Sequence, residues 1–151
     1  MPVTTADAGI DVSFNPVPDF PWKTISAVIQ TLTNTSDGWE AIWAWKPTEI
    51  AGVILGAPRF FCSDIGTSLE LDLFSVDVGN GQITGGSSLL TGTVTLTGDK
   101  TPGLGTLADD PTIIPAGTTV YLKQIAAVGT NTLLNIQIPY RPLLGHERGT
   151  P

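Results

Sequence analysis

The chain has 151 residues, 41% of them hydrophobic and 14% charged, and its formal net charge at pH 7 is −7. This length fits one domain. The chain has seven scattered basic residues, which disfavour nucleic acid as a partner because phosphate binding depends on lysine and arginine. A single cysteine excludes an internal disulfide, and no apolar stretch approaches the roughly 18 residues that a membrane span needs.

Residues 1–22 form a distinct segment that is rich in proline. Proline fixes φ and removes a hydrogen-bond donor, so we expect neither a helix nor a central strand there. The same segment has unusually many apolar side chains for a solvated tail, namely Val12, Phe14, Val17, Phe20 and Trp22. We predict an extended arm that packs either along its own domain or on the sheet edge of a neighbouring subunit.

Two predicted strands follow the arm, Ile25 to Thr33 and Trp39 to Lys46, and a turn at 34–38 joins them. Because side chains alternate along a strand, Trp39, Trp43 and Trp45 share one face of the second strand. A tryptophan face of this kind is typical of a core or of a subunit interface, and it also suits stacking on sugar rings. The sequence leaves these three interpretations open.

The central part of the chain continues with short apolar runs between turns. The predicted strands are 50–55, 59–63, 67–78, 82–84 and 89–97. After Leu73 the apolar positions change parity, which predicts a β-bulge or a strand that passes from one sheet to the other. Residues 98–111 show no periodicity, so we expect a loop at one end of the domain.

The last third of the chain predicts two strands and the turn between them, a closing hairpin. Strand-forming residues dominate Thr118 to Val128, and a turn at 129–131 then reverses the chain. The next strand has apolar residues at period two, at Leu134, Ile136, Ile138 and Tyr140. Together these elements predict an all-β fold, an antiparallel β-sandwich resembling a jelly roll.

Two pairs of residues suggest catalysis, and neither pair is supported by a third group. Glu70 and Asp72 share a strand face about 6–7 Å apart, a spacing that suits glycoside hydrolysis but also arises by chance on a solvated strand. Cys62 and His146 are each the only residue of their kind, and nothing places them together. We predict no catalytic residue.

Three aspartates of the predicted 98–111 loop could offer oxygen ligands to calcium. Their spacing matches no EF-hand loop, and adjacent carboxylates before a proline are common in solvated turns; the three are Asp99, Asp109 and Asp110. Zinc would require three or four ligands, and the soft ones are missing. We therefore expect no metal and no cofactor.

The closing strands and their turns resemble a known group of proteins. The chain runs through a Pro115-Ala116-Gly117 turn, a strand, an Ala127-Val128-Gly129 turn, and a last strand that ends in Tyr140-Arg141-Pro142. This arrangement resembles virion proteins of tailed bacteriophages, above all the small capsid decoration, or cement, proteins.

The resemblance implies a structural virion protein, not an enzyme, that binds the outside of a phage capsid and stabilises it. Its partners would be the phage major capsid protein and its own copies in a homotrimer, with no nucleic acid and no membrane. Because the N-terminus lacks a signal-peptide pattern, we expect assembly in the host cytoplasm. The alternative is a fibre or receptor-binding module that recognises host surface glycans through the same tryptophans.

We predict three parts of the chain: an arm at 1–22, a β-sandwich at 23–142 and a C-terminal tail at 143–151. Apolar surface of the arm and of the tryptophan strand would supply the binding area, for which about 1,500 Å² suffices in a specific interface. The predicted partner-binding residues are Val12, Phe14, Phe20, Trp22, Trp39, Trp43 and Trp45.

Overall fold

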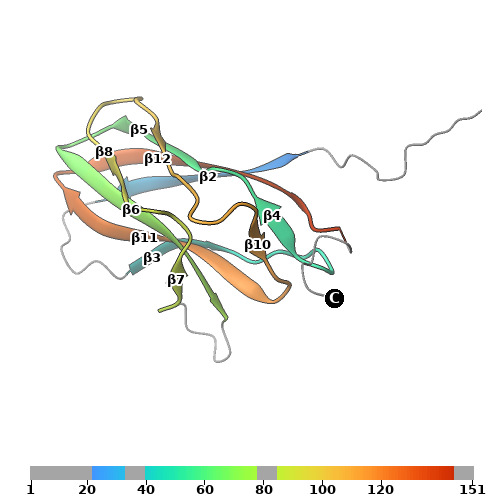
Figure 1. The fold of residues 1–151 in the computed structure, drawn as a ribbon. Coiled ribbons are helices and arrows are strands. Elements are labelled where there is room, and N and C mark those ends of the chain that lie inside the picture. The colour runs from blue at the N-terminus through green and yellow to red at the C-terminus, as the bar shows by residue number, and fades with distance from the viewer. Residues whose placement is uncertain (1–21, 33–39, 78–84, 145–151) are drawn as a thin grey trace, which may run out of the picture.

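The computed structural model describes residues 22–32, 40–77 and 85–144. These residues form eleven β-strands and no helix, and the strands make two antiparallel sheets that pack face to face (Figure 1). The prediction of an all-β antiparallel sandwich is confirmed. Within the described ranges there is no helix that could cross a membrane.

The first sheet is built around its longest strand, β12, and we call it the β12 sheet. β12 pairs on one side with β2, and on the other side first with β5 and then with β4. β9 and β10 lie outside β5 and β4, respectively. The strands of this sheet are β2 (Lys23–Leu32), β4 (Val53–Leu55), β5 (Arg59–Asp64), β9 (Gly103–Leu104), β10 (Thr112–Ile114) and β12 (Asn131–Pro142).

The second sheet, which we call the β11 sheet, is likewise built around its longest strand, β11. β11 pairs with β3 on one side and with β6 on the other, and β7 and β8 pair with the outer side of β6. The strands of this sheet are β3 (Glu40–Trp45), β6 (Ser68–Asp77), β7 (Ser87–Ser88), β8 (Val94–Leu96) and β11 (Thr118–Val128).

Alternate residues of the long strands fill the space between the two sheets. Each of these side chains is removed from water, and burying one of this size contributes about 1.5–3 kcal/mol. The completely buried residues include Phe60 of β5, Leu69, Leu71 and Leu73 of β6, Val120 and Leu122 of β11, and Leu134, Ile136 and Ile138 of β12. The period-two pattern of the sequence therefore identifies the core.

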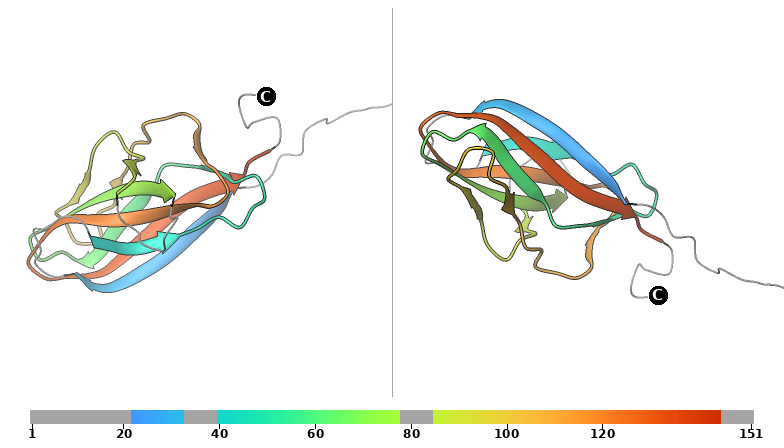
Figure 2. Two further views of the ribbon diagram at one scale, coloured as in Figure 1. Left: turned by 90° about the horizontal axis from the view of Figure 1, so that it is seen from below. Right: turned by 90° about the horizontal axis from the view of Figure 1, so that it is seen from above.

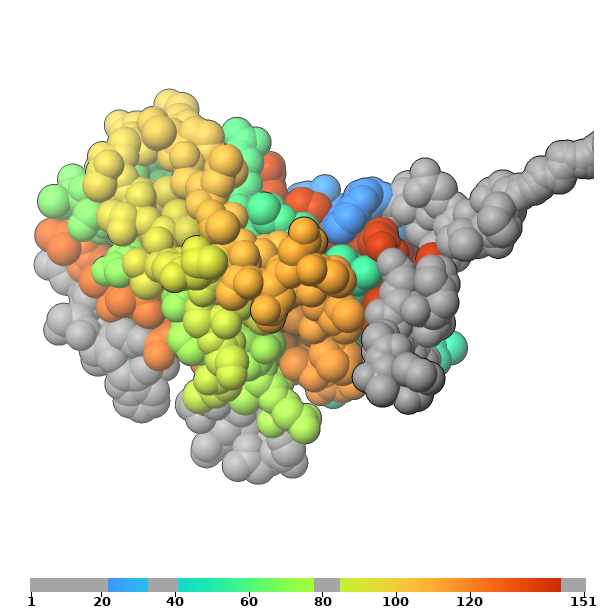
Figure 3. Space-filling view, viewed as in Figure 1, coloured from blue at the N-terminus to red at the C-terminus, as the bar shows by residue number. Residues whose placement is uncertain are grey.

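The two sides of the sandwich are covered differently. On one side, residues 85–116 run over the gap between the sheets as short strands and loops (Figures 1 and 3). On the other side, β2 and β3 are the outermost strands of their sheets (Figure 2). No strand of the described ranges pairs with the outer edge of either one.

The structure corrects the predicted closing hairpin. β11 and β12 follow each other in the chain but lie in different sheets, so they form an arch between the sheets. Gly129 lies in this connection with a φ of +81°, and a Cβ there would be 3.1 Å from the backbone of Gly66. Alternation in the sequence shows which side chains face the core, but it does not identify the partner strand.

The parity change after Leu73 does not mark a bulge in β6. β6 and β11 keep one register over residues 71–77 of β6, and the irregularity lies in β11, at Ile125. Phe74 belongs to the outward face of the sheet, where its ring stacks on that of Tyr121 with the centroids 5.5 Å apart. This outward apolar residue explains why the sequence pattern changes parity.

Residues 89–111 also differ from the prediction. Of the predicted strand 89–97, only Val94–Leu96 forms a strand, β8. The predicted loop 98–111 contains β9, and its backbone is fixed further by a bridge between Leu90 and Leu107. Gly105 N also donates a hydrogen bond to the Pro58 carbonyl at 2.9 Å. A two-residue strand has no periodicity that a sequence pattern can reveal.

Candidate interaction surface

Trp22 lies directly before β2 at the surface of the domain. Its side chain is 53% exposed, and the guanidinium carbon of Arg141 lies 5.7 Å from the centroid of the ring. The indole also approaches Gly56, where an added Cβ would lie 3.4 Å from Cζ3 of the Trp22 ring. An arginine–tryptophan pair therefore marks the point where the N-terminal segment joins the domain.

Trp43 and Trp45 of β3 make their contacts inside the domain. Both are half-buried and pack against the core cluster, as does Ile42, which directly precedes Trp43. The Trp45 ring lies 5.1 Å from the ring of Tyr140, which belongs to the inward face of β12. These contacts favour the core interpretation for this pair.

The other predicted partner-binding residues lie outside the described residues. They are Val12, Phe14, Phe20 and Trp39. Of the seven predicted residues, Trp22 alone combines a described position with a largely exposed side chain.

The outward face of the β12 sheet holds functional groups that the sequence analysis did not identify. On β5, the guanidinium carbon of Arg59 lies 5.8 Å from the centroid of the Phe61 ring, and its Nη1 donates to Gln137 Oε1 at 3.4 Å. Val28 of β2 is 53% exposed, and Leu104 of β9, opposite Arg59, is 69% exposed.

We call this surface the arginine face. It consists of Trp22, Val28, Arg59, Phe61, Leu104 and Arg141. The described strands of this sheet contain one acidic residue, Asp64, which is exposed at the end of β5, five residues from Arg59. The face is turned towards the viewer in the right-hand view of Figure 2, and no described strand or loop lies over β12 there.

The outward face of the β11 sheet has a different chemistry. Glu70 Oε2 accepts a hydrogen bond from Thr93 Oγ1 at 2.6 Å, and Asp72 Oδ1 accepts from Ser88 Oγ at 2.8 Å. Lys123, which is paired with Asp72 across the strands, places its Nζ 5.0 Å from the Phe74 ring. The two predicted carboxylates do share one face, where hydrogen bonds within the sheet hold each of them.

Asp72 makes the stability of the domain depend on pH. Burial raises the pKa of this carboxyl above its ordinary 3.8, so the folded state binds more protons than the unfolded state just above pH 3.8. Stability therefore falls as pH rises through this window. We expect Asp72→Asn to be more stable than the parent at pH 7, because Oδ1 still accepts from Leu73 N and Ser88 Oγ without a buried charge.

Urea unfolding at a series of pH values tests this expectation. The advantage of the Asp72→Asn variant should shrink as pH falls, and the two stabilities should converge below pH 3.8. A variant that is less stable than the parent at pH 7 would contradict it.

Cys62 and Asp99 have structural roles, and the backbone of Asp109 also accepts a hydrogen bond. Cys62 is completely buried, and burial raises the pKa of its thiol to about 11. Asp99 Oδ1 accepts from Ile65 N at 2.8 Å, and the Asp109 carbonyl accepts from Thr112 Oγ1 at 2.7 Å. Among the described residues, which do not include His146, no group of three His, Cys, Asp or Glu residues could hold a metal ion.

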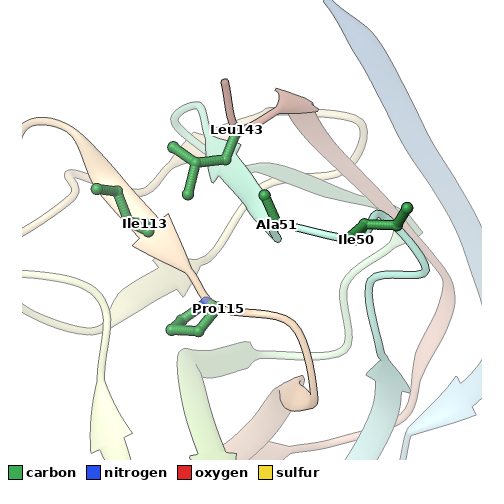
Figure 4. Close-up of a pocket in the computed structure, with 5 residues that line it drawn as sticks. All are labelled: Ile50, Ala51, Ile113, Pro115 and Leu143. Carbon is green, nitrogen blue, oxygen red and sulfur yellow. The ribbon is translucent and has the colours of Figure 1, made fainter. Parts of the chain in front are cut away.

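An apolar hollow of about 330 Å³ lies beside β10 (Figure 4). Because all the side chains around it are apolar, none of them would orient a polar ligand. An apolar cavity of about 150 Å³ already accommodates benzene, so this hollow has room for an aromatic side chain. It is lined by Ile50, Ala51, Ile113, Pro115 and Leu143.

Comparison with known proteins assigns no family to the chain. No protein-family profile matches it, and no curated protein matches it either.

Proposed function

We propose that this chain is a structural virion protein that binds the outer surface of a phage capsid and stabilises it, acting as a homotrimer. The resemblance of residues 113–142 to capsid decoration proteins supports the class. The observation on which the proposal depends most is Trp22, which is 53% exposed beside Arg141. Tryptophan and arginine are among the residues most enriched in interface hot spots.

The proposed partners are the phage major capsid protein and further copies of this chain. A specific interface buries about 1,200–2,000 Å², to which the arginine face and the N-terminal segment would contribute. Repetition over a capsid lattice multiplies modest affinities, because a trimer whose first subunit is bound presents the other two at high effective concentration. The proposed location is the exterior of the virion, after assembly in the host cytoplasm.

Cosedimentation with capsids tests the proposal. The full chain is mixed with capsids assembled from the major capsid protein of the phage that encodes it, and pelleted protein is quantified. We expect the full chain to pellet and a chain lacking residues 1–20 to stay in the supernatant, because the deletion removes most of the apolar arm. Circular dichroism of the truncated chain checks that the sandwich, whose first strand begins at Lys23, remains folded.

A point variant localises the contact. We expect Trp22→Ala to weaken capsid binding about tenfold or more, as truncation of a hot-spot tryptophan does. The control is Val128→Ala, which removes an apolar side chain that is 48% exposed on the other sheet. Failure of the full chain to pellet would contradict the proposal. Equal capsid binding by the full chain, Trp22→Ala and Val128→Ala would contradict it too.

The second candidate is a phage fibre module that recognises host glycans. The exposed indole of Trp22 favours it, because an aromatic ring offers an apolar platform for a sugar. A glycan array separates the two candidates. Glycan binding that is lost in Trp22→Ala, together with no binding to capsids, would identify the fibre module.

A further inference from the structure

We propose that residues 7–20 of this chain dock on the arginine face of the same molecule. The proposal concerns the free protein and does not depend on capsid binding. It identifies the arginine face as a binding site for an acidic, aromatic segment.

Charge is the first observation that supports this docking. Residues 1–21 include Asp7, Asp11 and Asp19 but no lysine or arginine. The arginine face has Arg59 and Arg141, and the only acidic residue on the described strands of its sheet is Asp64, five residues from Arg59 at the end of β5. The outward face of the other sheet is less suitable, because Glu70 and Asp72 stand beside its Lys123.

Apolar surface is the second observation. The arginine face exposes Trp22, Val28 and Leu104 by half or more. The N-terminal segment contains apolar side chains that could cover them, at Val12, Phe14, Val17 and Phe20. Covering both sets removes apolar area from water, while the aspartates remain close to the arginines.

The segment is long enough to reach both arginines. It joins the domain at Trp22, whose ring lies against Arg141, and Asp19 is three positions before Trp22, a span of at most about 10 Å. Asp11 can lie up to about 37 Å from Trp22. Arg59 is opposite Gln137, four residues from Arg141, so it lies about 13 Å along the strand and one strand spacing across.

The tether favours the segment's own chain over a second copy. A short flexible link gives an effective concentration in the millimolar range, far above the micromolar concentration of a second molecule in solution. Reversal of the chain before β2 is required, and proline and aspartate residues at 18–21 suit a turn. Two outcomes compete with this one: the segment of another copy occupies the arginine face, or the face stays unoccupied.

Paramagnetic relaxation in the full chain tests the docking. A nitroxide is attached to Ser13→Cys, and because Cys62 is completely buried, the label goes to the new thiol alone. We expect the amide signals of Phe61, Asn135 and Gln137 to broaden to the same degree at high and low protein concentration. A mixture of labelled protein without ¹⁵N and ¹⁵N protein without label should show no such broadening.

Two other outcomes would overturn the proposal. Broadening that occurs in the mixture would show that the segment of another copy occupies the face. Broadening confined to residues next to Trp22 would show that the segment does not dock. Neither result bears on capsid binding, because no capsid is present.

Charge variants then test the chemistry of the contact. Asp11→Asn with Asp19→Asn should abolish most of the broadening, and so should Arg59→Glu with Arg141→Glu. The control pair is Lys46→Glu with Lys100→Glu. It makes the same charge change as the two arginine substitutions, at exposed sites outside the β12 sheet, and should preserve the broadening. If the variant with Arg59→Glu and Arg141→Glu fails to fold, the variant with Asp11→Asn and Asp19→Asn tests the charge pairing instead, because its changes lie outside the sandwich. Full broadening in the asparagine variant would overturn the charge pairing.

Discussion

Replacement of Gly52 by alanine is expected to lower the free energy of unfolding by about 3–4 kcal/mol, the sum of left-handed backbone strain and overpacking. Gly52 directly precedes β4 and has a φ of +98°. A Cβ there would lie 2.3 Å from the Ile114 carbonyl oxygen and 3.0 Å from the backbone nitrogen of Ala116. Both neighbours are backbone atoms, so no side-chain rotation can relieve the contact, and β4 and β10 must move apart.

Gly117→Ala is the matched control for this prediction. Gly117 has a φ of +90°, but a Cβ there would meet nothing within 4 Å. We therefore expect the control to lose only about 1–2 kcal/mol, the cost of the left-handed backbone. Chemical denaturation of both variants measures the difference, and equal losses would show that Gly52 is not sterically constrained.

Replacement of Asn131 by leucine is expected to cost about 2–4 kcal/mol, because it leaves buried backbone groups without partners. Asn131 is completely buried at the start of β12. Its Oδ1 accepts from Gly66 N at 2.9 Å, and its Nδ2 donates to the Ser68 carbonyl at 3.4 Å. The side chain thus connects the first residue of the β12 sheet's central strand with the start of β6 in the other sheet.

Asn135→Leu, the same substitution four residues later, is the control for Asn131→Leu. Asn135 is half-buried on the outward face, and its Nδ2 donates locally to the Leu133 carbonyl at 3.1 Å. Asn135→Leu should cost less than about 1 kcal/mol, as is usual for a surface substitution. Thermal unfolding of both variants checks the order, and a larger loss for Asn135→Leu would contradict the role assigned to Asn131.

The fold was predictable where strands are long and their alternation is regular. The pattern of Leu134, Ile136 and Ile138 identified both a strand and its core face, and all three side chains are completely buried. Connections were less predictable, because alternation is the same whether β12 pairs with β11 or lies in the opposite sheet. The jelly-roll connectivity remains a prediction.

The candidate surface was predictable only in part. Proline content and apolar residues directed attention to Trp22, whereas the alternation of Trp43 and Trp45 could not distinguish a core face from an exposed one. Arg59 and Phe61 were missed, although the sequence contains a usable signal. They alternate with the buried Phe60, which places them on the outward face of the same strand.

Electron microscopy of capsids incubated with the full chain tests the proposed function most directly. If the proposal holds, a phage encodes this protein, and the capsids used are those of that phage, assembled without the protein. The proposal predicts added density on the outer surface, in trimers that fit the sandwich, and no added density with the chain that lacks residues 1–20. Bare capsids at saturating concentrations of folded full-length protein would contradict it.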